Sequence, residues 1–311
     1  MHYVVTGAAG FLGFHIASRL LREGHRVTGL DNFHSGSESN VAQLARHEDF
    51  TFRRHDVVDP YDIPCDAVLN LACPASPPHY QRDPVYTARI AFLGTLHALE
   101  NAQRHGARLL QASTSEIYGD PLVHPQTEDY WGNVNPLSPR GCYDEGKRLA
   151  ETLCADFYRV GRADARIARI FNTYGPNMRR DDGRVITNFI NQALRGEALS
   201  VYGDGGQTRS FCYVDDLVEG FVRLLAVELN PGPVNLGNPV EMSVRELAEE
   251  VRLQFGVGLP IRYESMPVGD PQRRCPDISK AHRVLDNWEP EVSLSEGLAR
   301  TIAHFRGRDG E

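Results

Sequence analysis

The sequence lacks the features of several classes of protein. Its six cysteines form no CxxC pair and none stands at zinc-ligand spacing from a histidine, so we expect reduced, structural thiols and no metal site. No segment approaches the roughly 20 apolar residues of a transmembrane helix. The first strand is expected to begin at His2, which leaves no room for a signal peptide and favours a cytoplasmic protein.

Positive charge is also in short supply. Lysine and arginine together number 33 against 41 aspartates and glutamates, a formal net charge of -8. This balance argues against nucleic acid or an anionic membrane as the main partner. It does not exclude a small anionic ligand, because the binding of such a ligand depends on the charged groups at its site and not on the net charge of the chain.

Short apolar runs alternate with amphipathic stretches through the first half of the chain, as in "YVVTGA", "FLGFHIASRLLREG" and "RVTGLD". The alternation predicts an α/β fold with a Rossmann-type doubly wound parallel sheet, where ligands bind at the carboxyl ends of the strands. We interpret 1–172 as a nucleotide-binding domain and 173–311 as mostly a smaller C-terminal substrate domain. Residues 211–238 are expected to return to the first domain.

A glycine-rich loop follows the first strand. "VTGAAGFLG" places Gly7, Gly10 and Gly13 where a strand passes into a helix, the pattern of a loop that binds a dinucleotide pyrophosphate. Asp31 ends the second strand, where its carboxylate would accept hydrogen bonds from a ribose and repel a 2′-phosphate, which favours NAD over NADP. Asp56, at a third strand end, is either an adenine contact or a turn residue. The other expected cofactor contacts are Phe11, Leu12, Asn32, Val57, Leu71, Ala72 and Ser113.

A candidate catalytic pair lies in "CYDEGK". Tyr143 and Lys147 are four residues apart and share a face if the segment is helical. A neighbouring ammonium group and the positive ring of NAD would lower the pKa of the tyrosine and make it a usable base, so both residues are also expected to contact the cofactor. Upstream, "QASTSEIYGD" ends a buried strand with hydroxyl groups and one carboxylate.

Linked motifs along essentially the whole chain resemble the extended short-chain dehydrogenase/reductase family of nucleotide-sugar enzymes, and within it the UDP-glucuronate decarboxylases (UDP-xylose synthases). The matching stretches are "PASPPHY" (74–80), "STSEIYGDP" (113–121), "HPQTEDYWGNVNP" (124–136), "CYDEGKRLAET" (142–152), "RIFNTYGP" (169–176), "DGRVITNF" (182–189) and "DPQRRCPDI" (270–278).

Position 115 separates the subfamilies. The related 4,6-dehydratases carry aspartate there, the acid that expels a hydroxyl group as water, whereas this chain has Ser115. A serine hydroxyl is far too weak an acid for that step. The related 4-epimerases lack the pair formed here by Ser115 and Glu116. The resemblance therefore implies decarboxylation of UDP-glucuronate to UDP-xylose, with tightly bound, recycled NAD, through oxidation at C4, loss of carbon dioxide and re-reduction.

The resemblance also implies roles for the catalytic residues. Tyr143 would take the proton of the C4 hydroxyl group, Lys147 would support it, and Thr114 would hold the C4 oxygen. Ser115 and Glu116 would lie near the C5 carboxylate; both could instead cap the following turn.

Arg274 would reach the sugar, with Arg273 as the adjacent alternative, although a surface salt bridge is the plainer reading of such an arginine. The remaining substrate contacts are expected at Pro77, Tyr80, Asn172, Arg184, Val185, Asn188, Tyr202, Gln207 and Arg209. Arg209 is the best diphosphate ligand among them, because a guanidinium group pairs bidentately with phosphate.

Other functions stay open on sequence alone. A TDP-sugar could replace the UDP-sugar, and a nucleotide-sugar 4-epimerase or 4,6-dehydratase is the nearest enzymatic alternative. A non-catalytic NAD-binding sensor is the alternative from another class. A homodimer through 85–105 and 143–160 is implied by the resemblance only.

Overall fold

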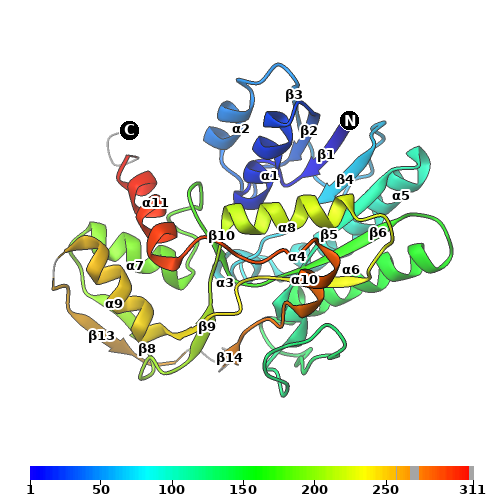
Figure 1. Ribbon diagram of the computed structural model, residues 1–311. Helices are drawn as coiled ribbons and strands as arrows, with labels where there is room; N and C mark the ends of the chain where they lie inside the picture. Colours follow the sequence, from blue (N-terminus) through cyan, green and yellow to red (C-terminus); the bar gives the residue numbers. More distant parts are fainter. Residues whose placement is uncertain (257, 267–272, 308–311) are drawn as a thin grey trace.

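A seven-stranded parallel sheet forms the centre of the molecule (Figure 1). The computed structural model describes residues 1–256, 258–266 and 273–307. In the order β11-β6-β5-β4-β1-β2-β3, the strands are β11 (Pro233–Leu236), β6 (Ala165–Ile170), β5 (Arg108–Thr114), β4 (Ala67–Asn70), β1 (His2–Thr6), β2 (Arg26–Asp31) and β3 (Phe50–Arg54). From β1 the chain adds β2 and β3 on one side of the sheet, and then β4, β5 and β6 on the other side. The switch in strand order lies between β1 and β4, and sheets of this kind bind ligands at such a point. The predicted doubly wound fold is confirmed.

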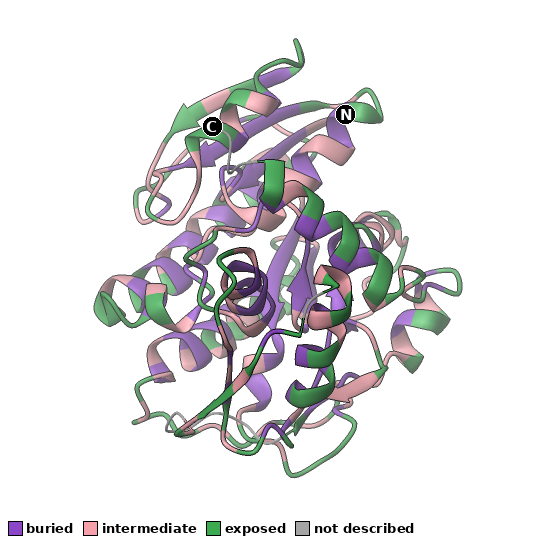
Figure 2. Cartoon of the chain, turned by 90° about the vertical axis from the view of Figure 1, so that its left-hand side faces the viewer, coloured by how far each residue is buried: buried purple, intermediate pink, exposed green. Residues whose placement is uncertain are grey.

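Helices cover both faces of the sheet because alternate strand residues point to opposite sides. Val5 packs on one face with α1 (Phe11–Arg22) and α8 (Val214–Ala226). Val4 packs on the other face with α5 (Thr95–His105) and α6 (Gly141–Arg159). Figure 2 shows the central strands buried and the outer faces of many helices exposed. The remaining elements of this half are α2 (Glu38–Leu44), α3 (Pro77–Tyr80), α4 (Pro84–Arg89), the π-helical η1 (Ile90–Gly94) and the 3-10 turn η2 (Ser115–Tyr118).

A smaller region lies beside the carboxyl edge of the sheet, on the left of Figure 1. Its α9 begins at a capping box, in which Ser243 and Glu246 satisfy each other's backbone N–H groups. Its helices are α7 (Val185–Leu194), α9 (Val244–Phe255) and α11 (Leu294–Gly307), whereas α10 (Ser279–Val284) packs against β11 of the central sheet. Its strands are β7 (Thr173–Tyr174), β8 (Leu199–Tyr202), β9 (Thr208–Ser210), β10 (Cys212–Tyr213), β12 (Glu241–Ser243), β13 (Ile261–Glu264) and β14 (Arg273–Arg274).

Residues 211–238 supply α8 and β11, which belong to the sheet and its helical cover. The domain limits 1–172 and 173–311 stay a prediction. The first part of "DPQRRCPDI", 270–272, lies outside the described residues. Among the helices that the structure describes, none has the length and apolar character needed to cross a membrane.

Candidate active site

A cavity of about 700 Å³ opens along the carboxyl edge of the sheet. The loop after β1 and the ends of β2, β4 and β5 form one side of it, and residues from 170 to 211 together with Arg274 form another. Of the residues singled out from the sequence, all but Tyr80 line this one cavity. The fold therefore brings together side chains from positions 7 to 274.

The glycine loop is built for close backbone approach. A Cβ atom on Gly13 would lie 2.0 Å from the carbonyl oxygen of Gly7, so the first turn of α1 can pack on the loop only without a side chain. Gly7 has a φ of +71°, and a Cβ there would lie 2.9 Å from the backbone nitrogen of Ala72. This cradle fits a pyrophosphate at the start of α1. Phe11, Leu12 and Leu71 line the same part of the cavity.

Asp31 stands at the end of β2, where the ribose contact was expected. Its carboxylate accepts backbone hydrogen bonds from Ala9 (3.0 Å) and Phe33 (2.8 Å). Burial raises the pKa of Asp31, and these hydrogen bonds oppose the rise. The backbone thus holds the carboxylate in place at the cavity wall.

Asn32 and Asp56 meet beside it. The Asn32 amide donates to Asp56 (3.1 Å), and the hydroxyl group of Tyr86 also donates to Asp56 (2.5 Å). Although burial acts to raise the pKa of Asp56, these hydrogen bonds lower it overall. Val57 follows on the same wall. The group is suited to the adenosine end of a dinucleotide.

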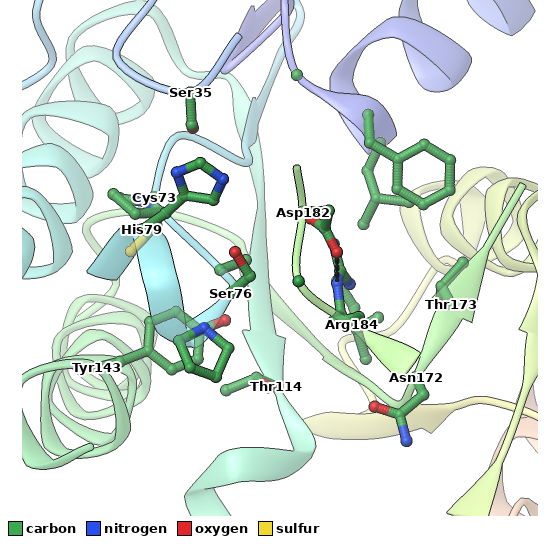
Figure 3. A pocket seen from close by; sticks show the side chains of 18 of the residues that line it. Ser35, Cys73, Ser76, His79, Thr114, Tyr143, Asn172, Thr173, Asp182 and Arg184 are labelled. Atoms are coloured by element: carbon green, nitrogen blue, oxygen red, sulfur yellow. Dashed lines mark hydrogen bonds and ion pairs between the residues drawn. The ribbon is translucent and has the colours of Figure 1, made fainter. Parts of the chain in front are cut away.

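Tyr143 and Lys147 lie one turn apart on α6, as the spacing predicted. The Lys147 ammonium group donates to the carbonyl oxygen of Ala112 in β5 (2.9 Å) and lies 5.7 Å from the centre of the Tyr143 ring. Figure 3 shows the Tyr143 ring close to Thr114, at the end of that strand. A helix and a strand are thereby fixed to each other at the reactive end of the cavity.

In the chain alone, burial sets the acidity of Tyr143. Burial raises its pKa well above the ordinary value, and Cys73 and Glu116 add to the rise. The hydrogen bond with Thr114 and the charge of Arg184 lower it by less. Desolvation of the phenolate therefore outweighs the nearby positive charge in the chain alone. The predicted lowering, which includes the positive ring of bound NAD, stays a prediction.

Tyr80 was expected to contact the substrate, but the structure places it outside the cavity lining. It is almost fully buried and stacks on Tyr143, with ring centres 5.1 Å apart and planes within 6° of parallel. It lies behind the Tyr143 ring and does not line the cavity. Its expected contact with substrate therefore has no support in this geometry, and its effect on the site passes through the Tyr143 ring.

Ser113 also has a partner that the sequence did not indicate. Its hydroxyl group donates to Glu151 at 2.5 Å, one side of a buried ion pair between Glu151 and Arg169. Ser113 still lines the cavity, but its hydroxyl proton is already used in the hydrogen bond to Glu151. A cofactor contact through this side chain is therefore limited to accepting a hydrogen bond.

Glu116 follows β5 in the turn η2 and is held between two arginines. Arg140 donates to one of its oxygens at 2.6 Å, and Arg274 grips both oxygens, one of them at 2.9 Å. Burial acts to raise the pKa of Glu116, but the two positive charges outweigh it and lower the pKa. The neighbouring Arg273 is exposed, so Arg274 is the arginine that enters the site.

Ser115 is buried beside this group and lines the cavity. The carboxylate of Glu116 is fully ion-paired, so it stays ionised and cannot serve as a proton donor near neutral pH. We refer to Glu116, Arg140 and Arg274 as the pocket triad.

The far wall is formed by the smaller region. Arg184 pairs with both oxygens of Asp182, one at 2.9 Å, and Figure 3 shows this pair across the cavity from Tyr143. Gln207 donates to the carbonyl oxygen of Tyr202 (2.9 Å), while its own side-chain oxygen is buried without a partner among the described residues. The other lining residues expected for the substrate are Pro77, Asn172, Val185, Asn188 and Arg209.

Sequence reasoning missed several lining residues. Arg140 has a local signal, because it stands three positions before Tyr143 where α6 begins. Asp182 precedes Arg184 by two positions and could have been suspected as its partner. Ser76 and His79 lie within the motif "PASPPHY" but were not singled out. Other lining residues that no local pattern marks include Cys73, His34, Ser35 and Arg179. Within the described ranges, no three histidine, cysteine, aspartate or glutamate side chains are grouped to hold a metal ion.

Known proteins resemble this chain over nearly its full length. UDP-glucuronic acid decarboxylase 6 of Arabidopsis thaliana is 52% identical over 311 residues, covering 100% of this chain and 90% of the relative. UDP-glucuronic acid decarboxylase 1 of Xenopus tropicalis is 52% identical over 303 residues, covering 97% of this chain and 72% of the relative.

Solved structures agree. A UDP-glucuronic acid 4-epimerase from Bacillus cereus, in complex with UDP-glucuronic acid and NAD, superposes with a TM-score of 0.89 at 29% identity, covering 99% of this chain and 100% of that one. A dTDP-glucose 4,6-dehydratase from Streptomyces venezuelae, with NAD bound, gives 0.90 at 27% identity, covering 100% and 98%. The model of the NAD dependent epimerase/dehydratase family matches residues 3–237. The chain belongs to this family, as its motifs predicted.

Proposed function

We propose that the protein decarboxylates UDP-glucuronate to UDP-xylose and carbon dioxide. The observation that carries the proposal is the turn Thr114-Ser115-Glu116, which stands beside Tyr143 with serine at the position where a dehydratase needs an acid. The two curated relatives named above, each 52% identical, support the same reaction.

The cofactor fits the glycine cradle and the carboxylate of Asp31. Bound NAD supplies a reversible acceptor of hydride. Such chemistry is needed because direct loss of the C5 carboxylate would leave an unstabilised carbanion, whereas a ketone at C4 lets the charge spread as an enolate.

The residues of the chain manage protons and charge. Tyr143 takes the proton of the C4 hydroxyl group, and Thr114, at the end of β5, orients the C4 oxygen. Lys147 holds α6 against β5 and so fixes the position of Tyr143. To act as a base Tyr143 must be ionised when the sugar binds, and the charges of Lys147 and of the positive ring of bound NAD would favour that form; the proton taken from the C4 hydroxyl group is later returned to the C4 oxygen.

Ser115 and the pocket triad are assigned to the part of the sugar that carries the C5 carboxylate. Ser115 offers a hydroxyl group to the departing carboxylate, and Arg274 offers N–H groups where negative charge develops on the enolate. Glu116 positions Arg274 and Arg140 by its three ion-pair contacts. The triad thus stabilises charge and orients groups, while the proton for C5 comes from elsewhere.

The diphosphate and base are assigned to the smaller region. Arg209 is the diphosphate ligand, and Arg184 and Asn188 lie along the same wall. The unpaired oxygen of Gln207 is an acceptor suited to the N3–H group of a pyrimidine base. Uracil and thymine share that group, so this contact accepts either base.

The deciding assay supplies UDP-glucuronate or TDP-glucuronate and measures carbon dioxide and the nucleotide-sugar product. We expect carbon dioxide and UDP-xylose. Formation of UDP-galacturonate without carbon dioxide would identify an epimerase, and turnover of the TDP-sugar alone would move the assignment to that nucleotide.

Replacing Tyr143 with phenylalanine separates an enzyme from a sensor. We expect Tyr143→Phe to lower kcat by several orders of magnitude, on the order of 10³ or more, because the base is lost. The matched control is Tyr158→Phe on the exposed side of α6, which should keep the wild-type rate. An unchanged rate in Tyr143→Phe would contradict the mechanism.

A homodimer through 85–105 and 143–160 is part of the proposal. Val85, Phe92 and Leu149 are exposed apolar residues on α4, η1 and α6, and a symmetric partner would cover them. Light scattering should give twice the chain mass; a monomer at assay concentration would contradict this. The six free cysteines fit a reducing compartment such as the cytoplasm, which cell fractionation would test.

A further inference from the structure

Ser76 carries a hydroxyl group that the fold does not use. The residue stands just before α3, and its carbonyl oxygen accepts from the backbone N–H groups of His79 and Tyr80, each at 3.0 Å. Serine at such a position ordinarily caps the helix with its side chain. Here the Ser76 Oγ caps nothing and has no partner anywhere in the part of the chain that is described, although the residue is only 1% exposed.

An unpartnered buried hydroxyl group is costly in a folded protein and calls for an explanation. Ser76 lines the cavity. Figure 3 places its side chain between Cys73 and Tyr143, on the wall opposite Arg184 and Asn172. The hydroxyl group therefore lies enclosed in the cavity wall, next to the space in which the reacting part of a ligand would lie.

The backbone around Ser76 holds the hydroxyl group at that place. Two prolines follow, and the Pro78 ring packs against Gly183 so closely that a Cβ on Gly183 would lie 2.7 Å from it. Gly183 has a φ of +80°, which a side chain would strain further. This contact joins the turn after β4 to the far wall of the cavity, so Ser76 has little freedom to find a protein partner by moving.

We propose that Ser76 is a substrate-contacting residue whose hydroxyl group hydrogen-bonds to an oxygen of the sugar ring or its substituents. The inference rests on the proposed function for the class of ligand, a nucleotide sugar. It adds a contact from the sheet side of the cavity to those from the smaller region. A sugar held from both walls is fixed relative to Tyr143 and Thr114, which its oxidation at one carbon requires.

The test compares two serines of the same kind. Ser210 is also 1% exposed, and its hydroxyl group also lacks a partner within the described segments, but it does not line the cavity. Ser76→Ala and Ser210→Ala are made in a Tyr143→Phe background, which prevents turnover. Calorimetry then measures Kd for UDP-glucuronate and for UDP, which has no sugar.

We expect Ser76→Ala to weaken UDP-glucuronate binding by about 3- to 15-fold, the effect of one neutral hydrogen bond, and to leave UDP binding and NAD content unchanged. Ser210→Ala should change neither. The melting temperature of unliganded Ser76→Ala should equal or exceed that of its parent, because no hydrogen bond of the fold is lost; this also confirms that the variant folds.

Equal weakening for UDP and UDP-glucuronate, loss of NAD, an effect no larger than that of Ser210→Ala, or a lowered melting temperature would each overturn the inference. The proposed function fails in a different way. If the wild-type protein releases no carbon dioxide while the Ser76 difference persists, the reaction is wrong and the sugar contact stands. If the parent variant binds neither compound, both proposals fall.

Discussion

Two buried ion-pair clusters lie on either side of the end of β5, and they differ in what they connect. The pocket triad joins Glu116 to Arg140 and Arg274, and its longest link spans 158 positions and both halves of the molecule. The second cluster joins Glu151 of α6 to Arg169 of β6 and Ser113 of β5, all within the sheet half. We call it the sheet cluster.

The two clusters share chemistry and differ in surroundings. Both arginines are buried, but Arg274 lines the cavity, whereas Arg169 does not and donates also to Tyr118 (2.9 Å) and to the carbonyl oxygen of Glu128 (2.8 Å). The sheet cluster has satisfied its hydrogen bonds inside the fold. The pocket triad presents part of its arginine surface to a ligand. We therefore expect damage to the triad to affect catalysis and damage to the sheet cluster to affect stability.

The largest expected effect is on catalysis, at Arg274. Arg274→Met should lower kcat by about 10²- to 10³-fold, because it removes the donor placed where negative charge develops. Glu116 keeps its pair with Arg140, so the melting temperature should change little. Steady-state carbon dioxide release and thermal unfolding, measured on the same preparation, check both statements.

Arg274→Lys serves as the companion variant. It keeps the charge but loses the two-pronged grip on Glu116, so we expect an intermediate rate. If Arg274→Met unfolds the protein and leaves the remaining folded fraction fully active, the assignment of the triad to catalysis is wrong.

The next effect is on stability, at Glu151. Glu151→Gln removes a charge but not the shape, leaving the buried guanidinium of Arg169 without a counter-ion at a cost of about 3–5 kcal/mol of unfolding free energy. The folded fraction should keep most of its activity. Denaturant unfolding measures the loss, and Glu145→Gln on the same helix is the control. Glu145 forms an exposed pair with Arg148, so its replacement should change stability by about 0.5 kcal/mol or less.

Local spacing explains what the sequence could predict. A strand-to-helix turn is indicated within seven residues by Gly7, Gly10 and Gly13. A single helical turn is enough to bring Tyr143 and Lys147 onto the same face. Both features depend on the backbone next to them, so their arrangement follows from the secondary structure.

Tertiary contacts explain what it could not. The pairing of Glu116 with Arg274 depends on how two distant segments meet, and the link between Ser113 and Glu151 depends on the register of α6 against β5. Tyr80 was expected at the substrate and stacks on Tyr143 instead, because only the folded path of α3 places one ring on the other. The burial that raises the pKa of Tyr143 in the chain alone could not be foreseen for a related reason, because it depends on the surroundings of the folded ring.

The smallest expected effect tests how the pocket triad tolerates a second carboxylate. Asp144 is buried one turn beyond Arg140 on α6, and one of its oxygens has no partner among the described residues. Burial raises the pKa of Asp144, and the charge of Glu116 raises it further. The folded state therefore favours the protonated form, whereas the unfolded chain ionises near the ordinary value of 3.8.

The sign of the pH dependence follows. Below the unfolded pKa both states are protonated and Asp144 costs nothing; as pH rises toward the folded pKa, ionisation stabilises the unfolded chain alone and stability is lost. Asp144→Asn removes this loss, so its melting temperature should exceed that of the wild type by a few degrees at about pH 8 and approach it at about pH 4. A melting temperature below that of the wild type at about pH 8, with a deficit that disappears toward about pH 4, would mean that Asp144 is ionised in the fold and belongs to the triad as a fourth charged member.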